Sequence, residues 1–308
     1  MIDLRCVETD EDVEVFLALR AAIDPEHMMS RVSYVEEIKR PERADLIASL
    51  DGEPAGCAFV EPHSENVGGP VAWVSVRVLR ERRRHGVGTV LFREVSALAR
   101  AQGRDALIFP SRHDDVDSLD YLGKRGFVEA LRLRDGVLDL EQAVSRFDPP
   151  DGVDIVPIEA RHERELYAVA GVIARDIPSA QEAFEIGSFE QWRRDELRAN
   201  TAWDCSFVAL SEGAVIGYAI LLDDGDGVGM NVMTGVLPDW RRRGIALALK
   251  QAQIDAARAR GLRKLRTSNA MENPMRQVNE RLGYRRDVDW IHLRGPLLDG
   301  PAAASGPK

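Results

Sequence analysis

The sequence is poor in the features that mark secreted, membrane-spanning and metal-binding proteins. It has only three cysteines, Cys6, Cys57 and Cys205, and they form neither a Cys-x-x-Cys pair nor a Cys/His ligand pattern. We therefore expect small buried thiols in a reducing compartment and no metal site. No apolar run approaches the roughly eighteen residues of a membrane span, and the first residues lack the basic and apolar parts of a signal peptide. These absences predict a cytoplasmic protein.

An excess of positive charge is also absent. The net charge is −10, which opposes binding to nucleic acids and to anionic membranes, so neither is expected as a partner. An acidic body is compatible with a cationic acceptor molecule. With 308 residues, of which 44% are hydrophobic, the chain is long enough for two cores of about 150 residues each.

A short basic turn between an apolar strand and a helix occurs twice, in residues 78–92 and 236–250. In both copies an arginine begins the pattern Arg-x-x-Gly-x-small. The pattern residues are Arg83, Gly86 and Gly88 in the first copy and Arg241, Gly244 and Ala246 in the second. Such a turn leaves backbone N–H groups without partners at a helix N-terminus, and glycines let a ligand come close to them. Together with the arginines, these groups predict a pyrophosphate site in each copy.

The repeat extends well beyond this turn. Each copy follows a hairpin with a tight turn and the pattern Gly-x-x-x-Gly-x-Ala, at residues 52–58 and 213–219. After each copy comes a helix that ends at a glycine, and then a pair of a glycine and an aromatic residue, at 126–127 and 283–284. Whole domains are therefore duplicated.

The segment 148–152 is rich in proline and glycine and separates the two copies. It predicts an N-terminal domain at 1–148 and a C-terminal domain at 151–298. The small and polar residues 299–308 are expected to form a flexible tail.

These motifs resemble motif A of the GNAT acetyltransferase superfamily, with its Gln/Arg-x-x-Gly-x-Gly/Ala signature and its closing glycine and phenylalanine. The resemblance implies two tandem α/β domains, each a mixed, mostly antiparallel sheet flanked by helices. It also implies acetyl-CoA as the co-substrate. In that superfamily the loop amides hold the pyrophosphate, and the preceding strand runs beside the pantetheine arm and donates an N–H to the thioester oxygen.

The resemblance assigns the ends of these strands, the loops, the first helical turns and two later asparagines to cofactor binding. In the first domain these residues are Val76, Val78, Arg83, Arg84, His85, Gly86, Val87, Gly88 and Thr89. In the second domain they are Thr234, Gly235, Val236, Arg241, Arg242, Arg243, Gly244, Ile245, Ala246, Leu247, Asn269 and Asn273. Two alternatives stay open: the asparagines cap the helix that follows, and His85 faces solvent.

The tyrosine that usually protonates the leaving thiolate in this superfamily is absent from both domains. Leu122 and Asn279 occupy its positions, four residues before the closing glycines. Asn279 is therefore a candidate for holding the thioester. The acceptor amine must also lose a proton, which is worth about 4 kcal/mol for an amine of pKa about 10 at pH 7. Glu190 and Asp176 are the candidate bases, with solvated helix caps as the alternative.

The second domain keeps more polar residues after its motif, so we expect it to be catalytic and the first to be structural or a second cofactor site. The predicted function is acetyl-CoA-dependent N-acetylation of a primary amine on a small molecule. Two other readings stay open: a CoA-binding or sensory module without turnover, and a protein N-acetyltransferase. A monomer is compatible with the repeat, because the two domains can pair with each other.

Overall fold

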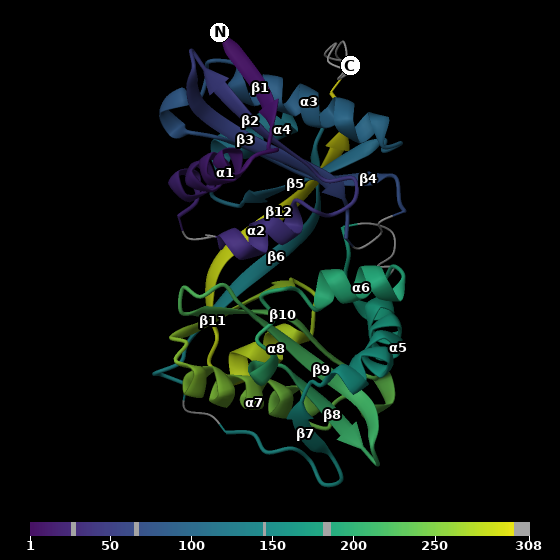
Figure 1. The fold of residues 1–308 in the computed structure, drawn as a ribbon. Coiled ribbons are helices and arrows are strands. Elements are labelled where there is room, and N and C mark those ends of the chain that lie inside the picture. Colours follow the sequence, from purple (N-terminus) through teal and green to yellow (C-terminus); the bar gives the residue numbers. More distant parts are fainter. Residues whose placement is uncertain (26–28, 65–67, 144–145, 181–185, 299–308) are drawn as a thin grey trace. The chain divides into compact units, whose positions relative to one another are not determined.

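The computed structural model describes residues 1–25, 29–64, 68–143, 146–180 and 186–298, and the predicted tail at 299–308 lies outside them (Figure 1). Contacts divide the chain into two compact units. The first contains Met1–Ala130 and the segment from His292 onward, and the second contains Leu131–Ile291. We call them the N-terminal unit and the C-terminal unit.

The N-terminal unit is built on five strands in the order β1-β2-β3-β4-β5. Neighbours are antiparallel except for the last pair, which is parallel. The strands are β1 (Ile2–Cys6), β2 (Ala44–Leu50), β3 (Glu53–Pro62), β4 (Val71–Val78) and β5 (Ala106–Arg112). The helices are α1 (Asp10–Ile23), α2 (Arg31–Glu37), α3 (Val87–Ala101) and α4 (Val116–Gly123).

The C-terminal unit repeats this arrangement, with the order β7-β8-β9-β10-β11 and again one parallel pair at the end. The strands are β7 (Asp154–Pro157), β8 (Phe207–Ser211), β9 (Ala214–Asp223), β10 (Val228–Val236) and β11 (Lys264–Ala270). The helices are α5 (Glu163–Ile173), α6 (Phe189–Glu196), α7 (Ile245–Arg260) and α8 (Met275–Arg281). The predicted mixed, mostly antiparallel sheets with flanking helices are confirmed.

Two long strands, β6 (Val128–Asp139) and β12 (Arg285–Pro296), pass from one unit to the other. From Leu131 onward β6 belongs to the C-terminal unit, where it pairs antiparallel with the full length of β11. The last part of β12 belongs to the N-terminal unit, and β12 is the neighbour of β5 in the strand order. Each repeat therefore contributes a strand to the other unit. The boundary at 148–151 remains a prediction about the repeats.

The sheet of the C-terminal unit is covered on both faces. One face packs on α7 through Ala219, Val236 and Leu249, and the other packs on α5 and α6 through Trp192 and Tyr218. Successive residues of β9 point to opposite faces, as a strand requires, so Tyr218 and Ala219 serve different cores. The sheet therefore separates the side chains that pack on α5 and α6 from those that pack on α7.

Cys57 and Cys205 are buried, as predicted, and Cys6 is exposed. The expectation of a buried thiol is wrong for Cys6, because it lies at the end of β1, where the outward side of the edge strand is open. Within the described residues, each helix is either too short or too polar to cross a membrane.

Candidate active site

The basic turn has the same backbone conformation in both units. Arg84 and Arg242 have positive φ angles of 66° and 61°, and Gly86 and Gly244 both have a φ of 89°. The long helices α3 and α7 begin at the next residue. Only glycine adopts such an angle without strain, which explains why a glycine closes the turn in both copies.

The first arginine of each turn ties the loop to the preceding strand. Arg83 donates from Nε to the carbonyl of Val78 at 3.3 Å, and Arg241 makes the matching bond to Val236 at 2.9 Å. Arg241 also donates from Nη1 to Asp176 at 2.7 Å. Asp176, predicted as a base, therefore pairs with the loop in this structure, and its catalytic role stays a prediction.

The backbone N–H groups that follow these arginines are available to a ligand. In the described part of the chain, no hydrogen-bond partner is found for those of residues 84–88 and 242–247. The side chains of Val87, Ile245 and Leu247 are buried, so these residues offer only their backbone. A row of unpaired N–H groups at a helix N-terminus binds phosphate groups well.

The other predicted loop residues are exposed. Arg84, Arg242 and Arg243 lie at the surface, and Arg243 stacks over the ring of Trp240, 4.8 Å from its centroid. His85 places Nδ1 2.8 Å from the carbonyl oxygen of Arg83, so its ring contacts its own loop while the residue faces solvent.

The strands before these loops are only partly paired on the side of the parallel neighbour. β4 pairs with β5 from Val71 to Trp73, and β10 pairs with β11 from Val228 to Asn231. The later residues have no pairing on that side within the described chain, and they include Val76, Val78 and residues 234–236. The predicted thioester-binding segments therefore keep backbone groups free for a ligand.

One difference separates the two strands. β10 has a bulge between Asn231 and Met233, where Val232 is the additional residue, whereas β4 pairs with β3 in a regular register throughout. A bulge turns a strand and redirects the residues that follow it. No sequence pattern marks this bulge, because the pairing of β10 with β9 defines it.

Asn279 lies where the family tyrosine is expected, and its side chain is buried on α8. Its Nδ2 donates to Oδ1 of Asn269 on β11 at 2.7 Å. Its Oδ1 and the hydroxyl of Thr234 are buried and have no partner in the described residues. Buried polar atoms are rarely left unpaired, so the two atoms suit a ligand with both a donor and an acceptor, such as the amides of a pantetheine arm.

Asn273 makes the contact of a helix cap. Its Oδ1 accepts a hydrogen bond from the N–H of Met275, in the first turn of α8, at 2.9 Å. Asn273 therefore caps the following helix, which was one of the two expected roles. Cofactor binding by Asn273 stays a prediction.

The C-terminal unit has a further carboxylate, Glu196, which was not among the candidates from the sequence. Glu196 ends α6, is partly exposed, and accepts a hydrogen bond from the hydroxyl of buried Tyr218 at 3.2 Å. Burial of the carboxyl group raises the pKa of Glu196 to about 7, and the hydrogen bond from Tyr218 opposes this only in part. Tyr218 in turn pairs with Gly235 of β10. Glu190 is exposed in the first turn of the same helix.

The acetyltransferase (GNAT) family model matches residues 13–127 and 173–284. The chain belongs to the GNAT family. Both units thus carry a GNAT region, which confirms the resemblance on which the sequence analysis relied. GNAT proteins transfer acyl groups from acyl-CoA, and the free loop amides and unpaired strand ends of this chain fit such a co-substrate. No curated protein matches the chain.

Solved structures agree on the fold. A GCN5-related N-acetyltransferase from Sphaerobacter thermophilus has 19% identity, a TM-score of 0.75, and coverage of 99% of this chain and 98% of its own. A tandem GNAT protein from the clavulanic acid biosynthesis pathway has 20% identity, a TM-score of 0.78, and coverage of 97% and 100%. A glucosamine N-acetyltransferase region in a fungal β-N-acetylglucosaminidase has 17% identity, a TM-score of 0.70, and coverage of 96% and 38%. At these identities the likeness concerns the fold alone.

The two units differ in the residues on one face of the sheet, which is the face that holds Glu196 in the C-terminal unit. By the hairpin and motif spacing, Cys57 and Arg77 stand where Tyr218 and Gly235 stand in the C-terminal unit, and they also pair across the two strands. Arg77 donates to Asp24 at 2.8 Å. An ion-paired arginine thus stands where the C-terminal unit has Gly235, against which Ile173 of α5 packs.

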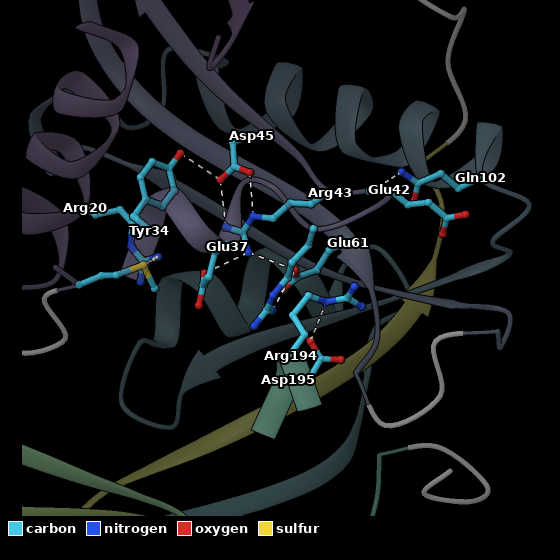
Figure 2. Close-up of polar contacts among 12 residues, drawn as sticks. Arg20, Tyr34, Glu37, Glu42, Arg43, Asp45, Glu61, Gln102, Arg194 and Asp195 are labelled. Atoms are coloured by element: carbon cyan, nitrogen blue, oxygen red, sulfur yellow. Dashed lines mark hydrogen bonds and ion pairs between the residues drawn. The ribbon is translucent and has the colours of Figure 1, made fainter. Parts of the chain in front are cut away.

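A buried ion cluster occupies the region between α2 and the strands of the N-terminal unit (Figure 2). The side chain of Arg43 is 1% exposed and contacts both oxygens of Asp45, at 2.8 and 3.0 Å. It also contacts Glu37 and Glu61, each at 3.1 Å, while Tyr34 donates to Asp45 at 3.2 Å. Each of these carboxylates is paired with the same guanidinium.

The family tyrosine position of the N-terminal unit is apolar, unlike Asn279 in the C-terminal unit, because it is occupied by buried Leu122. The adjacent Tyr121 is only partly buried, and its hydroxyl lies 3.3 Å from Oγ1 of Thr89 in the first turn of α3. Thr89, predicted to bind the cofactor, therefore has a partner within the protein.

Proposed function

We propose that the C-terminal unit transfers an acetyl group from acetyl-CoA to the primary amine of a small molecule, with Glu196 as the general base. The observation that carries the proposal is Glu196, a partly exposed residue whose buried carboxyl group has its pKa raised to about 7 and which Tyr218 links to β10. In the N-terminal unit the carboxylates of the corresponding region are bound by Arg43.

A carboxylate with a pKa near 7 is suited to this role. It is largely deprotonated just above neutral pH, yet basic enough to accept a proton from an alkylammonium group as the amine attacks. An ordinary carboxylate, with a pKa near 4, would be a much weaker base. Near neutral pH, Glu196 is therefore both substantially deprotonated and basic enough to accept the proton of the amine.

Each remaining group has one role. The free N–H groups of residues 242–247 would hold the pyrophosphate, and Asn279 and Thr234 the pantetheine arm. Backbone N–H groups at 234–236 would stabilise the oxygen that becomes negative. Acetyl-CoA supplies the activated thioester. Because an asparagine does not titrate, the thiolate would leave as the anion or take the proton that the amine releases.

Two observations favour a small acceptor. The glucosamine N-acetyltransferase region and the clavulanic acid pathway protein, both similar in fold, are named for small-molecule chemistry. The net charge of −10 also suits a cationic amine. A thiol-release assay with acetyl-CoA should show turnover with amino sugars or amino acids. Turnover only with peptides would favour a protein acceptor, and binding without turnover would favour a sensory module.

Glu196→Gln should lower kcat/KM by about 10²- to 10⁴-fold, because general base catalysis typically contributes that much. The base acts when deprotonated, so the wild-type rate should rise with pH through about 7, and this limb should disappear in the variant. Measuring kcat/KM from pH 5.5 to 9 checks both points. Glu190→Gln tests the rival base on the same helix. A larger loss there than at Glu196 would overturn the assignment.

Calorimetric titration with acetyl-CoA should show two sites per chain, because the loop has the same backbone conformation in both units. We expect the N-terminal site to be the weaker one, since β4 lacks the bulge and Leu122 replaces a polar side chain. A stoichiometry of one would remove the prediction for one unit, and repeating the titration with Gly86→Glu would identify which.

A further inference from the structure

A fully buried polar network lies under α7 in the C-terminal unit. Asn231 is its centre: its Oδ1 accepts hydrogen bonds from Nζ of Lys250 at 2.6 Å and from the hydroxyl of Tyr284 at 2.8 Å. Its Nδ2 donates to Oε1 of Gln253 at 3.2 Å. All four residues are buried, with Lys250 2% exposed and Gln253 wholly inaccessible. The network joins α7 to β10 and to Tyr284, the residue directly before β12.

Such a network is costly to bury. A lysine and two amides give up their hydration, and burial lowers the pKa of Lys250 to about 7. The hydrogen bonds return only part of this cost, and Nε2 of Gln253 has no partner in the described residues. Replacing buried charged groups by well-packed apolar residues of similar volume is often neutral or stabilising.

The N-terminal unit has an apolar core at the corresponding place. Counted from the motif and closing glycines, Phe92, Val95 and Phe127 occupy the positions of Lys250, Gln253 and Tyr284. With the extra residue of the bulge allowed for, buried Val74, which pairs with Val60, occupies the position of Asn231, which pairs with Leu221. Phe92 packs against Phe127 with ring centroids 5.8 Å apart. The same fold therefore forms without the polar groups, so folding alone does not explain them.

The network coincides with the bulge of β10. Asn231 is the last residue of β10 that pairs with β11, and the bulge at Val232 follows directly. The N-terminal unit, which has Val74 at this position, has no bulge in β4. The polar network and the bulge thus occur together in one unit and are absent together from the other.

We propose that Lys250 is a positioning residue for acyl transfer: through Asn231 it holds β10 at the bulge, directly before residues 234–236. These residues carry the backbone N–H groups assigned above to the thioester oxygen, so the inference rests on the proposed function. Small errors in the placement of such donors reduce the rate strongly while binding contacts elsewhere persist.

Lys250→Met tests the proposal, because methionine has a similar length and no ammonium group. We expect kcat to fall at least tenfold, whereas KM for acetyl-CoA should change less than threefold, because the pyrophosphate loop is intact. Amide hydrogen exchange at residues 232–236 should become at least tenfold faster. Phe92→Met, at the same helix position in the N-terminal unit, is the control and should leave kcat and this exchange unchanged.

Unchanged exchange at residues 232–236 in Lys250→Met would overturn the proposal, and so would a kcat within twofold of wild type. If wild-type protein turns over no amine, the proposed function fails, but the exchange measurement still decides the role of the network. Should Lys250→Met not fold, Tyr284→Phe removes a single hydroxyl and installs the residue of the sibling unit. It should increase the same exchange severalfold, and an unchanged pattern would contradict the inference.

Discussion

Gly244→Glu should abolish acetyl transfer, whereas Gly86→Glu should leave most of it. Both glycines have a φ of 89°, so the backbone strain of a side chain, about 1–2 kcal/mol, is the same in both variants. A Cβ at Gly244 would meet no heavy atom within 4 Å, and at Gly86 the nearest is Cδ1 of Ile2 at 3.6 Å. The new carboxylate would thus fit the fold and stand among the N–H groups assigned to the pyrophosphate.

The measurement is thiol release at saturating amine, with melting temperatures to confirm that both variants fold. We expect a loss of more than about 10²-fold for Gly244→Glu, because charge repulsion adds to the lost phosphate contacts. Gly244→Ala carries the same strain without the charge and should retain much more activity. The reverse ranking of Gly244→Glu and Gly86→Glu would place catalysis in the N-terminal unit.

Cutting the chain between the repeats, at 148–151, should leave neither half folded. The C-terminal half would lose β6, which pairs with β11 along its whole length. It would also lose Leu138 and Leu140, each 2% exposed in the core of that unit. Loss of a buried leucine side chain costs about 2–5 kcal/mol, so two of them approach the whole stability of a domain. The N-terminal half would lose the end of β12 in the same way.

The two halves should restore each other when they are produced together, because each carries the strand that the other lacks. Ion pairs within the C-terminal unit favour this association: Asp289 of β12 accepts from Arg134 of β6 at 3.0 and 3.3 Å. Circular dichroism and limited proteolysis of the halves, alone and together, give the measurement. A cooperative melting transition for residues 151–308 alone would show that the exchanged strand is dispensable.

Glu196 shows why the proposed base could not be read from the sequence. Trp192 and Glu196 share one face of α6, four residues apart, which is a local signal. The raised pKa, however, depends on burial against Tyr218, 22 residues away on another element. In the sequence, Glu190 and Asp176 are carboxylates like Glu196. In the structure, Glu190 is exposed and Asp176 pairs with Arg241. The residue type alone therefore did not distinguish Glu196 from the other two carboxylates.

Local chemistry determined the repeated parts of this protein. The hairpin turns have positive φ at both central residues, Asp51 and Gly52 in one unit and Glu212 and Gly213 in the other. Such turns, like the glycine that closes each basic loop, depend on residues a few positions apart, and the sequence contains all of them. The GNAT assignment and the predicted phosphate loops follow from this local information.

Only the tertiary structure decided what makes the two units different. The pairing of β6 with β11 joins residues more than a hundred positions apart, and the bulge of β10 exists only relative to β9. The network around Asn231 gathers side chains from α7 and from Tyr284, directly before β12. Strand pairing and burial are set by neighbours in space, so a polar residue such as Lys250 reveals its environment only when the chain is folded.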